Sequence, residues 1–358
     1  MSSTYGENLK LSIFGQSHGK AIGMVLDGIP AGLPVDEAQL ADFMARRIPG
    51  GSAYTTGRKE PDRVVFLSGI VDGYTCGAPI AAVIENTDAK SGDYEDLKHT
   101  PRPGHADYTA QVKYGGFQDI RGGGHFSGRL TAPLCIAGGM CKQWLEEKGI
   151  RVGAHLIQVG GISAEPFDPI APQLDQVGQC FPTLSASSGE DFQQVIAQAK
   201  AQGDSVGGRV QCAATGLPAG LGAPMFGGVE NRIAQIVYAI PGVKAIGFGC
   251  GEAFASYMGS ESNDVYKTVD GRVVTETNHC GGILGGITNG MPVIFDATFK
   301  PTPSIGKPQQ TVDLRTGEGV TLELTGRHDP CIAVRAVPVV EAATAIALFD
   351  MILENWSK

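Results

Sequence analysis

Two separate parts of the chain show the same pattern of hydrophobic and polar positions. Residues 20–35 form an apolar, strand-like run that ends at a Pro and a Gly, and residues 209–222 repeat this pattern. Apolar side chains then recur at helical spacing in 35–47 and in 228–240, which predicts one amphipathic helix after each strand. The order strand, turn, helix therefore occurs twice.

A second pair of segments extends the repeat. Residues 69–80 and 282–293 align without a gap and share six of twelve positions. Both segments continue into strand-like sequence, at 80–84 and at 293–299. Chance similarity between Gly-rich segments is one explanation, but the matching order of several elements favours an internal duplication.

An apolar helix closes each copy. Arg129 and Pro133 open the first predicted helix, which runs to about residue 147. Arg335 and Pro338 open the second, which runs to about residue 354. If the two copies are related, they should pack about a pseudo-two-fold axis.

The repeat also predicts the domain organisation. We expect one domain over residues 1–358, built from halves at about 10–148 and 205–355 with a connector at 151–204. The connector carries a predicted amphipathic helix at 189–202 that stops at a Gly. The polar loops 85–128 and 300–334, which occupy equivalent places in the two halves, should line one cleft from opposite sides.

Composition narrows the class of protein. The chain has 358 residues, 42% hydrophobic and 18% charged, which is ordinary for a globular enzyme. A net charge of −9 argues against nucleic acid or an anionic membrane as a partner, since both need a broad basic surface. The first residues lack an apolar signal region, and the apolar stretch 337–353 carries Glu341 and Asp350. We therefore predict a cytoplasmic protein that does not enter a membrane.

The Cys and His residues do not follow a metal-binding pattern. The eight Cys include no CxxC pair, and the seven His include no HExxH motif. The prediction is a set of buried thiols and no metal site.

A local basic stretch, residues 102–129, stands out in this acidic chain. It combines Arg102, Arg121 and Arg129 with two His and the run Gly122-Gly123-Gly124. Consecutive Gly residues expose backbone N–H groups that can bind phosphate or carboxylate oxygens. A helix starting near Thr131 would direct its positive end at the same anion. A floppy surface loop is the alternative, and a nucleotide P-loop is excluded because Arg129 and Leu130 replace its Lys and its Ser or Thr.

Four short motifs are candidates for chemistry. They are FGQSHG at 14–19 with His18, RPGHADY with His105, KPTPS at 300–304 and GRHDPC at 326–331 with Asp329. Histidine and aspartate transfer protons, and Lys with hydroxyl groups suits a phosphate. Each could instead be an ordinary turn or a helix cap. No Rossmann fingerprint and no GxSxG elbow is present.

Together these motifs resemble chorismate synthase. The resemblance covers nearly the whole chain and rests on motifs in a fixed order. They are GQSHG, GIPAGLP, YTTGRKEPD, LSGIVDG, ENTDAKSGDY, RPGHADY, RGGG, DSVGG, LPAGLG, TNHCGGILGGITNG, KPT and GRHDPC.

The resemblance implies a fold, a reaction and an assembly. The fold would be α+β, a β-α-β sandwich of antiparallel sheets around central helices, assembled as a homotetramer. The reaction would be trans-1,4 elimination of phosphate from 5-enolpyruvylshikimate 3-phosphate to give chorismate, in the shikimate pathway to the aromatic amino acids. Reduced FMN would be required without net redox change. NADPH is a candidate reductant for the flavin, and an external reductase is the alternative.

The resemblance also implies roles for residues. His18 would protonate the departing phosphate, His105 would hold and protonate the reduced flavin, and Asp329 would be the base that receives the substrate proton through flavin N5. Substrate anions would be bound by Arg47, Arg102, Arg129 and Arg335, and NADP by Arg47. FMN contacts would be His125, Phe126, Ser127, Pro241, Gly242, Gly285, Lys300, Pro301, Thr302, Pro303, Ser304 and Arg327.

Several positions depart from the family pattern. Gln16 replaces a Glu, and Ala53 replaces an Arg beside YTT. The segment HFSGRLT at 125–131 stands where the family has RSSARET, so one Arg and one Glu are lost. Pro303 replaces a Ser and removes one hydroxyl group.

Two other functions compete with this interpretation. One is a non-catalytic flavin or phosphometabolite binder, against which the retained His18, His105 and Asp329 argue. The other is a histidine-based phosphatase or phosphotransferase, which would need no flavin.

Overall fold

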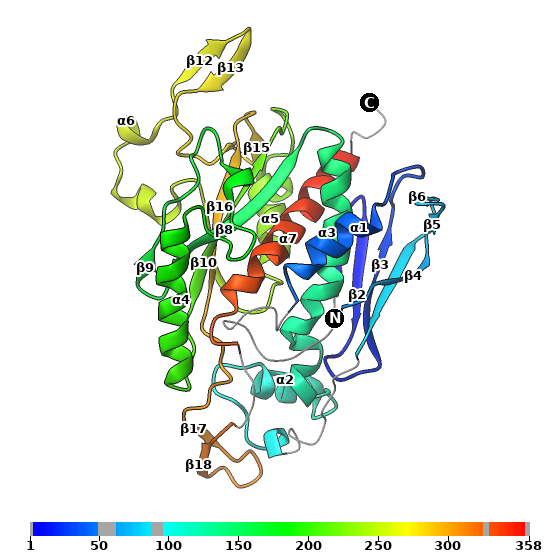
Figure 1. Ribbon diagram of the computed structural model, residues 1–358, viewed down its shortest axis with the longest axis vertical. Coiled ribbons are helices and arrows are strands. Elements are labelled where there is room, and N and C mark those ends of the chain that lie inside the picture. Colours follow the sequence, from blue (N-terminus) through cyan, green and yellow to red (C-terminus); the bar gives the residue numbers. More distant parts are fainter. Residues whose placement is uncertain (1–2, 49–61, 87–95, 325–328, 355–358) are drawn as a thin grey trace.

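The protein consists of two antiparallel sheets with two long helices between them. The computed structural model describes residues 3–48, 62–86, 96–324 and 329–354. Figure 1 shows the helices α3 (Thr131–Glu146) and α7 (Ala333–Leu353) running side by side between the sheets, and both begin at the same end of the molecule. This arrangement confirms the predicted α+β class.

The first sheet packs one apolar face on α3. Its strand order is β1 (Thr4–Tyr5), β2 (Lys10–Gly15), β3 (Ala21–Asp27), β7 (Ile80–Glu85) and β4 (Val65–Ser68). Side chains alternate between the two faces of a strand. In β3 the alternate residues Ile22, Met24 and Leu26 are fully buried, and they therefore form the inner face.

The second sheet packs on α7. Its strand order is β11 (Val243–Phe248), β16 (Val293–Phe299), β10 (Gly208–Thr215), β8 (Arg151–Val159) and β9 (Ile162–Ser163). Strand β16 occupies the predicted residues 293–299. Residues 151–159, which we assigned to the connector, are instead a strand inside this sheet.

The central helices approach each other closely. A Cβ built at Gly138 of α3 would lie 2.3 Å from Cβ of Ala342 in α7, so this crossing requires Gly. By length and hydropathy α7 could cross a membrane, but 89% of its apolar window is buried inside the protein. Helix α7 is therefore a core helix of the described part of the protein. It begins at Ala333, before Pro338, which we had expected to open it.

Smaller elements surround these layers. Figure 1 shows the hairpin β12–β13 projecting from one end of the molecule and β17–β18 from the other. The remaining helices are α1 (Glu37–Ala45), α2 (Asp107–Tyr114), α4 (Ala186–Ala201), α5 (Val229–Val237) and α6 (Gly259–Ser262). The hairpins pair β5 (Ile70–Val71) with β6 (Tyr74–Thr75), β12 (Tyr266–Val269) with β13 (Arg272–Thr275), β14 (Ile283–Leu284) with β15 (Ile287–Thr288), and β17 (Gln309–Val312) with β18 (Gly319–Leu322).

We propose that the two halves are copies of one unit, with the second copy starting at β8. The order β2-β3-β7-β4 in the first sheet matches β8-β10-β16-β11 in the second. Isolated β-bridges join Pro34 to Tyr74 and Gly222 to Ile287, at positions that the sequence repeat makes equivalent.

A buried threonine makes the same contacts in each half. Thr75 Oγ1 donates to the carbonyl of Pro30 at 2.7 Å and accepts from the N–H of Leu33 at 2.9 Å. Thr288 Oγ1 donates to the carbonyl of Pro218 at 2.6 Å and accepts from the N–H of Leu221 at 2.9 Å. The hydroxyl closes the same turn in both copies.

Thr75→Val and Thr288→Val should therefore destabilise the protein by similar amounts. Each change leaves a backbone N–H and C=O unpaired in a buried turn, which costs about 1–3 kcal/mol. Urea unfolding measures the loss, with Thr268→Val on the exposed strand β12 as the control. A loss confined to one of the two variants would contradict the equivalence of the turns.

Candidate functional site

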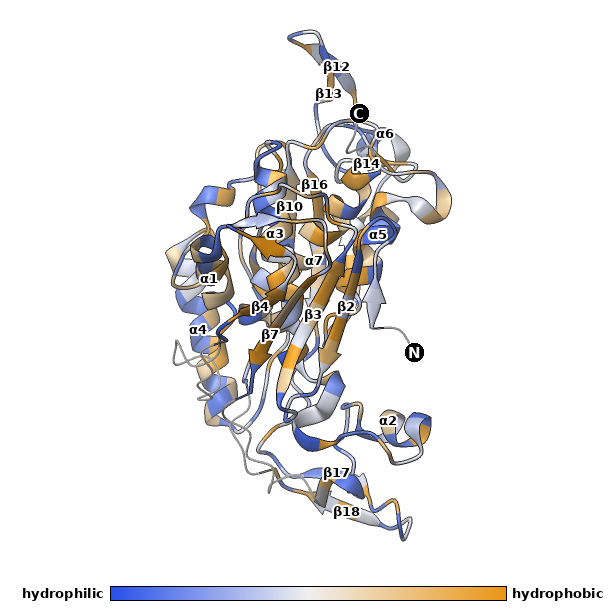
Figure 2. Cartoon of the chain, turned by 90° about the vertical axis from the view of Figure 1, so that its right-hand side faces the viewer, coloured by the Kyte–Doolittle hydropathy of each residue, from blue (hydrophilic) through white to orange (hydrophobic). Residues whose placement is uncertain are grey.

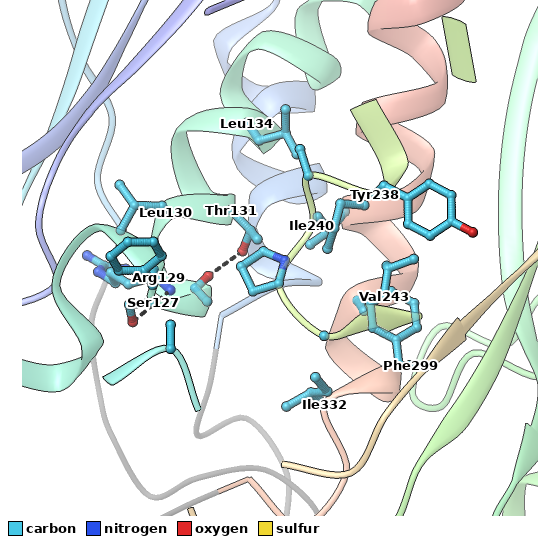
Figure 3. A pocket seen from close by; sticks show the side chains of 18 of the residues that line it. Ser127, Arg129, Leu130, Thr131, Leu134, Tyr238, Ile240, Val243, Phe299 and Ile332 are labelled. Carbon is cyan, nitrogen blue, oxygen red and sulfur yellow. Dashed lines mark hydrogen bonds between the residues drawn. The ribbon is translucent and has the colours of Figure 1, made fainter. Parts of the chain in front are cut away.

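A large cavity lies at the N-terminal ends of the two central helices. Its volume is about 1060 Å³. Figure 3 shows Ser127, Arg129 and Thr131 at the start of α3 on one side of it, and Ile332 at the start of α7 on the other. Helix N-termini carry partial positive charge and unpaired N–H groups. Both central helices therefore favour an anion in this cavity.

Charged side chains around the cavity are mostly basic. Among the residues that the structure describes, six Lys or Arg side chains line it, and Asp329 is the one acid that does. The six are Arg47, Arg102, Arg129, Lys244, Lys300 and Arg335. In a protein of net charge −9 this is a local reversal of sign, which attracts and holds anionic ligands.

Arg47 and Arg129 share one buried carboxylate. Each forms an ion pair with Asp62, whose side chain is fully buried. Arg47 also donates to Thr131 Oγ1 at 3.3 Å, and Arg129 donates to Asn86 Oδ1 at 3.2 Å. Burial raises the pKa of Asp62, but the two guanidinium groups outweigh this and hold the pKa below its usual range. Asp62 thus fixes both guanidinium groups at the cavity wall.

Arg335 and Asp329 form a second ion pair. Arg335 lies in the first turn of α7 and donates to Asp329 Oδ2. Both residues line the cavity, and the carboxylate of Asp329 is 5% exposed. A largely desolvated carboxylate at a ligand cavity is suited to accept a proton.

Asp107 organises a third group. It accepts from Arg102 Nε at 2.7 Å and Nη2 at 2.8 Å, and from His105 Nδ1 at 2.6 Å. Arg102 Nη1 also donates a hydrogen bond to Ser304 Oγ at 3.1 Å. Nδ1 of His105 faces Asp107, so its Nε2 edge faces Gly123. A Cβ built at Gly123 would lie 3.3 Å from Nε2 of His105. Burial raises the pKa of Asp107, but hydrogen bonds from Arg102 and His105 lower it well below its usual range.

Asp107→Asn should lower kcat/KM by about 10- to 100-fold, the usual effect of losing the partner that orients a site histidine. The amide lacks the negative charge and the second acceptor oxygen that Arg102 Nε uses, so it orients Arg102 and His105 less firmly. Steady-state kinetics measures the effect. Asp119→Asn is the control, because it breaks an ion pair with the more exposed Arg121 in the neighbouring turn. Equal kinetics in the two variants would contradict a positioning role for Asp107.

His18 lies behind the Gly triplet. Its side chain is buried, and a Cβ built at Gly122 would lie 2.2 Å from His18 Cε1. Gly122 lines the cavity, whereas His18 does not. The positive φ angles of Gly122, Gly123 and Gly124 allow the backbone to cover the imidazole this closely. The triplet is therefore packed against His18 rather than being a floppy loop.

The residues expected to contact a flavin fall into three places. His125, Phe126, Ser127, Pro241, Gly242, Lys300, Pro301, Thr302, Pro303 and Ser304 all line the cavity. Gly285 lies in the turn between β14 and β15 and is not among the lining residues. Arg327 lies outside the described residues.

The cavity has the two surfaces that a flavin mononucleotide needs. Figure 3 shows Ile240, Val243, Phe299 and Ile332 grouped on one wall, which suits an apolar ring system. Thr302 also lines the cavity, and its buried Oγ1 has no hydrogen-bond partner among the described residues. The basic groups and this hydroxyl suit a phosphate. The residues of this cavity therefore fit a flavin mononucleotide.

His125 occupies a defined place despite its departure from the family pattern. Its Nδ1 donates to the carbonyl of Gly15 at 2.8 Å, and its Nε2 is 2.8 Å from Ser3 Oγ. It thus holds the N-terminal segment beside the cavity.

Sequence reasoning missed three residues of this site. Asp62 and Asp107 lie inside the motifs YTTGRKEPD and RPGHADY. These motifs indicated the site, but they did not indicate which side chains the two carboxylates pair with. Lys244 lies in no motif that we identified.

Comparisons with known proteins agree on one family. A family model for chorismate synthase matches residues 9–353. Among curated relatives, chorismate synthase of Lancefieldella parvula is 45% identical over 99% of this chain and 97% of its own length. That of Aeropyrum pernix is 48% identical, covering 97% and 92%, and that of Pyrococcus abyssi is 47% identical, covering 97% of each chain.

A solved structure agrees as well. A crystal structure of chorismate synthase aligns with a TM-score of 0.78 and 27% identity, over 98% of this chain and 93% of that one. The chain therefore belongs to the chorismate synthase family and is a lyase of aromatic amino acid biosynthesis.

Proposed function

We propose that this chain eliminates phosphate from 5-enolpyruvylshikimate 3-phosphate to form chorismate, with reduced FMN bound in the same cavity. The observation that carries the proposal is that four Arg, His105 and Asp329 line one cavity of about 1060 Å³. A substrate with one phosphate and two carboxylates needs several cations, and guanidinium groups bind such anions in bidentate geometry.

The reduced flavin, when bound, supplies transient electron donation that helps to expel phosphate. The protein binds and orients the substrate. Arg47 and Arg129 are held by Asp62 at one wall and Arg335 by Asp329 at the other, so the cations are in place before the substrate arrives. Such preorganisation lowers the cost of reaching the reactive geometry.

Three residues have proposed roles in proton transfer. Asp329 is the base that takes up the proton lost by the substrate, and His105 holds and protonates the flavin. His18 protonates the departing phosphate, which places that phosphate at the Gly122 edge of the cavity because His18 packs against Gly122. His105→Ala should change the spectrum of bound reduced flavin, whereas His18→Ala should slow phosphate loss with little spectral change.

An anaerobic assay with substrate and chemically reduced FMN tests the proposal. Formation of chorismate that requires the reduced flavin is the expected result. Flavin binding without product would favour the non-catalytic binder. Release of phosphate without chorismate, and without flavin, would favour a phosphatase.

Arg129→Ala should lower kcat/KM by at least about 10-fold, which corresponds to about 1.4 kcal/mol of transition-state stabilisation. Its guanidinium group is nearly fully buried at the cavity wall. Arg121→Ala is the matched control, because Arg121 belongs to the preceding turn and is much more exposed. Unchanged kinetics in Arg129→Ala would remove Arg129 from the site.

The source of electrons is a separate part of the proposal. We propose NADPH as a reductant with Arg47 as its contact, although the side chain of Arg47 is only 2% exposed. Oxidised FMN with NADPH under anaerobic conditions should then support turnover without an added reductase. Turnover only with an external reductant would assign reduction to another protein.

We also propose a homotetramer assembled through the outer face of the first sheet. Figure 2 shows this sheet turned to the viewer with no helix in front of β2, β3 and β7. On its outer face Val65 is 43% exposed, Leu67 63% and Phe14 41%, and contiguous exposed apolar surface marks an interaction site. Leu67→Glu should shift the mass measured by light scattering toward the monomer. An unchanged mass would exclude this face.

The proposed compartment is the cytoplasm. All eight Cys are free thiols, four of them buried, and unpaired thiols are typical of reducing compartments.

A further inference from the structure

Two loops, one from each half of the chain, meet at the edge of the cavity. Arg102 Nη1 donates to Ser304 Oγ at 3.1 Å, and both residues are buried. Lys300 Nζ donates to the carbonyl of Gly104, and a Cβ built at Gly104 would lie 3.5 Å from Cβ of Pro303. All five residues line the cavity. The shape of this edge therefore depends on how the two loops are held relative to each other.

The hairpin β17–β18 lies beside these loops. Figures 1 and 2 both show it at the same end of the molecule as α2, which follows the first loop. Its residues alternate between half-buried and exposed, so Gln309 and Thr311 of β17 face the protein together. In β18, Val320 and Leu322 are half-buried in the same way. The hairpin thus has one face that packs on the protein and one face in water.

The inward face of β17 holds one carbonyl group in each loop. Thr311 Oγ1 donates to the carbonyl of Pro101 at 2.6 Å, and Gln309 Nε2 donates to the carbonyl of Pro303 at 3.3 Å. The two prolines immediately precede the arginine and the serine that meet at the cavity. Proline has no N–H group, so its carbonyl is the only backbone group through which a hydrogen bond can hold it.

The geometry of a strand fixes the spacing of these two contacts. Residues two apart on one strand lie about 7 Å apart on the same face, and Gln309 and Thr311 are related in this way. The N–H of Leu314, just after β17, adds a third contact by donating to the carbonyl of His99 at 2.8 Å. An isolated two-stranded hairpin is only marginally stable in water. The hairpin and the two loops therefore stabilise one another.

We infer that the hairpin β17–β18 is a brace, in which Thr311 and Gln309 are positioning residues for Arg102 and Ser304. Neither Thr311 nor Gln309 lines the cavity, so both act through the loops that they hold. The inference rests on the proposed function, in which Arg102 binds an anion of the substrate. Arg102 then has two supports, because Asp107 orients its guanidinium group and Thr311 holds the backbone before it.

Thr311→Val tests the brace, because it removes the hydroxyl group and keeps the shape of the side chain. The KM for 5-enolpyruvylshikimate 3-phosphate should rise about 3- to 10-fold, the range expected for one neutral hydrogen bond, while kcat changes much less. Thr311→Ser keeps the hydroxyl group and should retain the wild-type KM. Thr321→Val is the control, since Thr321 lies on the outward face of β18 and bonds to Gln310 within the hairpin.

Hydrogen–deuterium exchange gives a second readout, which does not depend on activity. The N–H of Arg102 donates to Asp107 Oδ2 at 3.0 Å, and the N–H of His105 donates to the carbonyl of Arg102 at 3.2 Å. Both amides should exchange faster in Thr311→Val than in the wild type or in Thr321→Val. If thermal melting shows that Thr311→Val does not fold, Gln309→Met removes the other donor and should raise the KM in the same direction.

A raised KM together with faster exchange in this loop supports the brace. An unchanged KM overturns the positioning role, even if exchange becomes faster, because the hairpin would then support only the fold. A fall in kcat without a change in KM, or a Thr311→Ser variant that behaves like Thr311→Val, also overturns it. A wild-type chain that forms no chorismate overturns the proposed function instead, and slow exchange that depends on Thr311 would still show that the hairpin holds the loop.

Discussion

Asp329→Asn is expected to lower kcat by about 10²- to 10⁴-fold, the usual contribution of a positioned general base. Reduced FMN and substrate should still bind. Asn keeps the size of Asp329 and can accept a hydrogen bond from Arg335, its partner in the first turn of α7, but it cannot take up a proton. The loss should therefore appear in turnover rather than in affinity.

Stopped-flow measurements under anaerobic conditions, with saturating reduced FMN, separate binding from turnover. Asp204→Asn is a matched control, because it removes the charge from a more exposed ion pair with Lys307. Thermal melting of both variants shows whether the fold is retained. Turnover near that of the wild type in a folded Asp329→Asn would mean that another group is the base.

The periodic elements of this fold could be predicted from the sequence because their signals are local. Strand β16 has the predicted bounds, and the helix expected at 189–202 is α4 at Ala186–Ala201. The place of β8 could not be predicted in this way. Its partner strand β10 follows only after a long segment containing α4, and no local pattern specifies such pairing.

The site was predictable at the level of residue types and motifs but not of contacts. Arg47, Arg102, Arg129 and Arg335 were expected at one cleft, and they line one cavity. Their partners were not expected, because Asp62 lies 67 positions before Arg129 and pairs with it only after folding. Lys244 was missed for a different reason. Its direction depends on a bulge between two strands, which leaves no trace in the spacing of apolar residues.

The position of His18 shows how the fold modifies a motif-based prediction. The motif FGQSHG suggested an imidazole in an open turn. In the structure Ser17 N donates to the carbonyl of Gly124 at 3.0 Å, so the turn is joined to the Gly triplet and the imidazole is covered by it. The two motifs, more than 100 residues apart, form one unit.

Glu341→Ala is expected to have the largest effect on stability, a loss of about 3–5 kcal/mol, because it leaves the charges of two partners uncompensated. Glu341 lies in α7 and is 2% exposed. It accepts from Arg46 Nη2 at 2.6 Å, Lys142 Nζ at 2.7 Å and the N–H of Ala154 at 3.1 Å. It therefore joins the end of α1, helix α3 and strand β8 to α7.

Urea unfolding measures the loss of stability in Glu341→Ala. The control is Asp175→Ala, because its exposed ion pair with Arg151 should contribute little to stability.

The same carboxylate should make stability depend on pH. Burial raises the pKa of Glu341, but Lys142 and Arg46 outweigh it and lower the pKa from 4.5 to about 2. A depressed pKa in the folded state means that the unfolded chain binds the proton first as the pH falls. The contribution of Glu341 is thus complete above pH 4.5 and is lost between about pH 4.5 and 2. Glu341→Gln should remove this part of the acid dependence, so the difference in unfolding free energy between wild type and variant should shrink across this window. A difference that stays constant with pH would show that the ion pairs of Glu341 do not contribute through its charge.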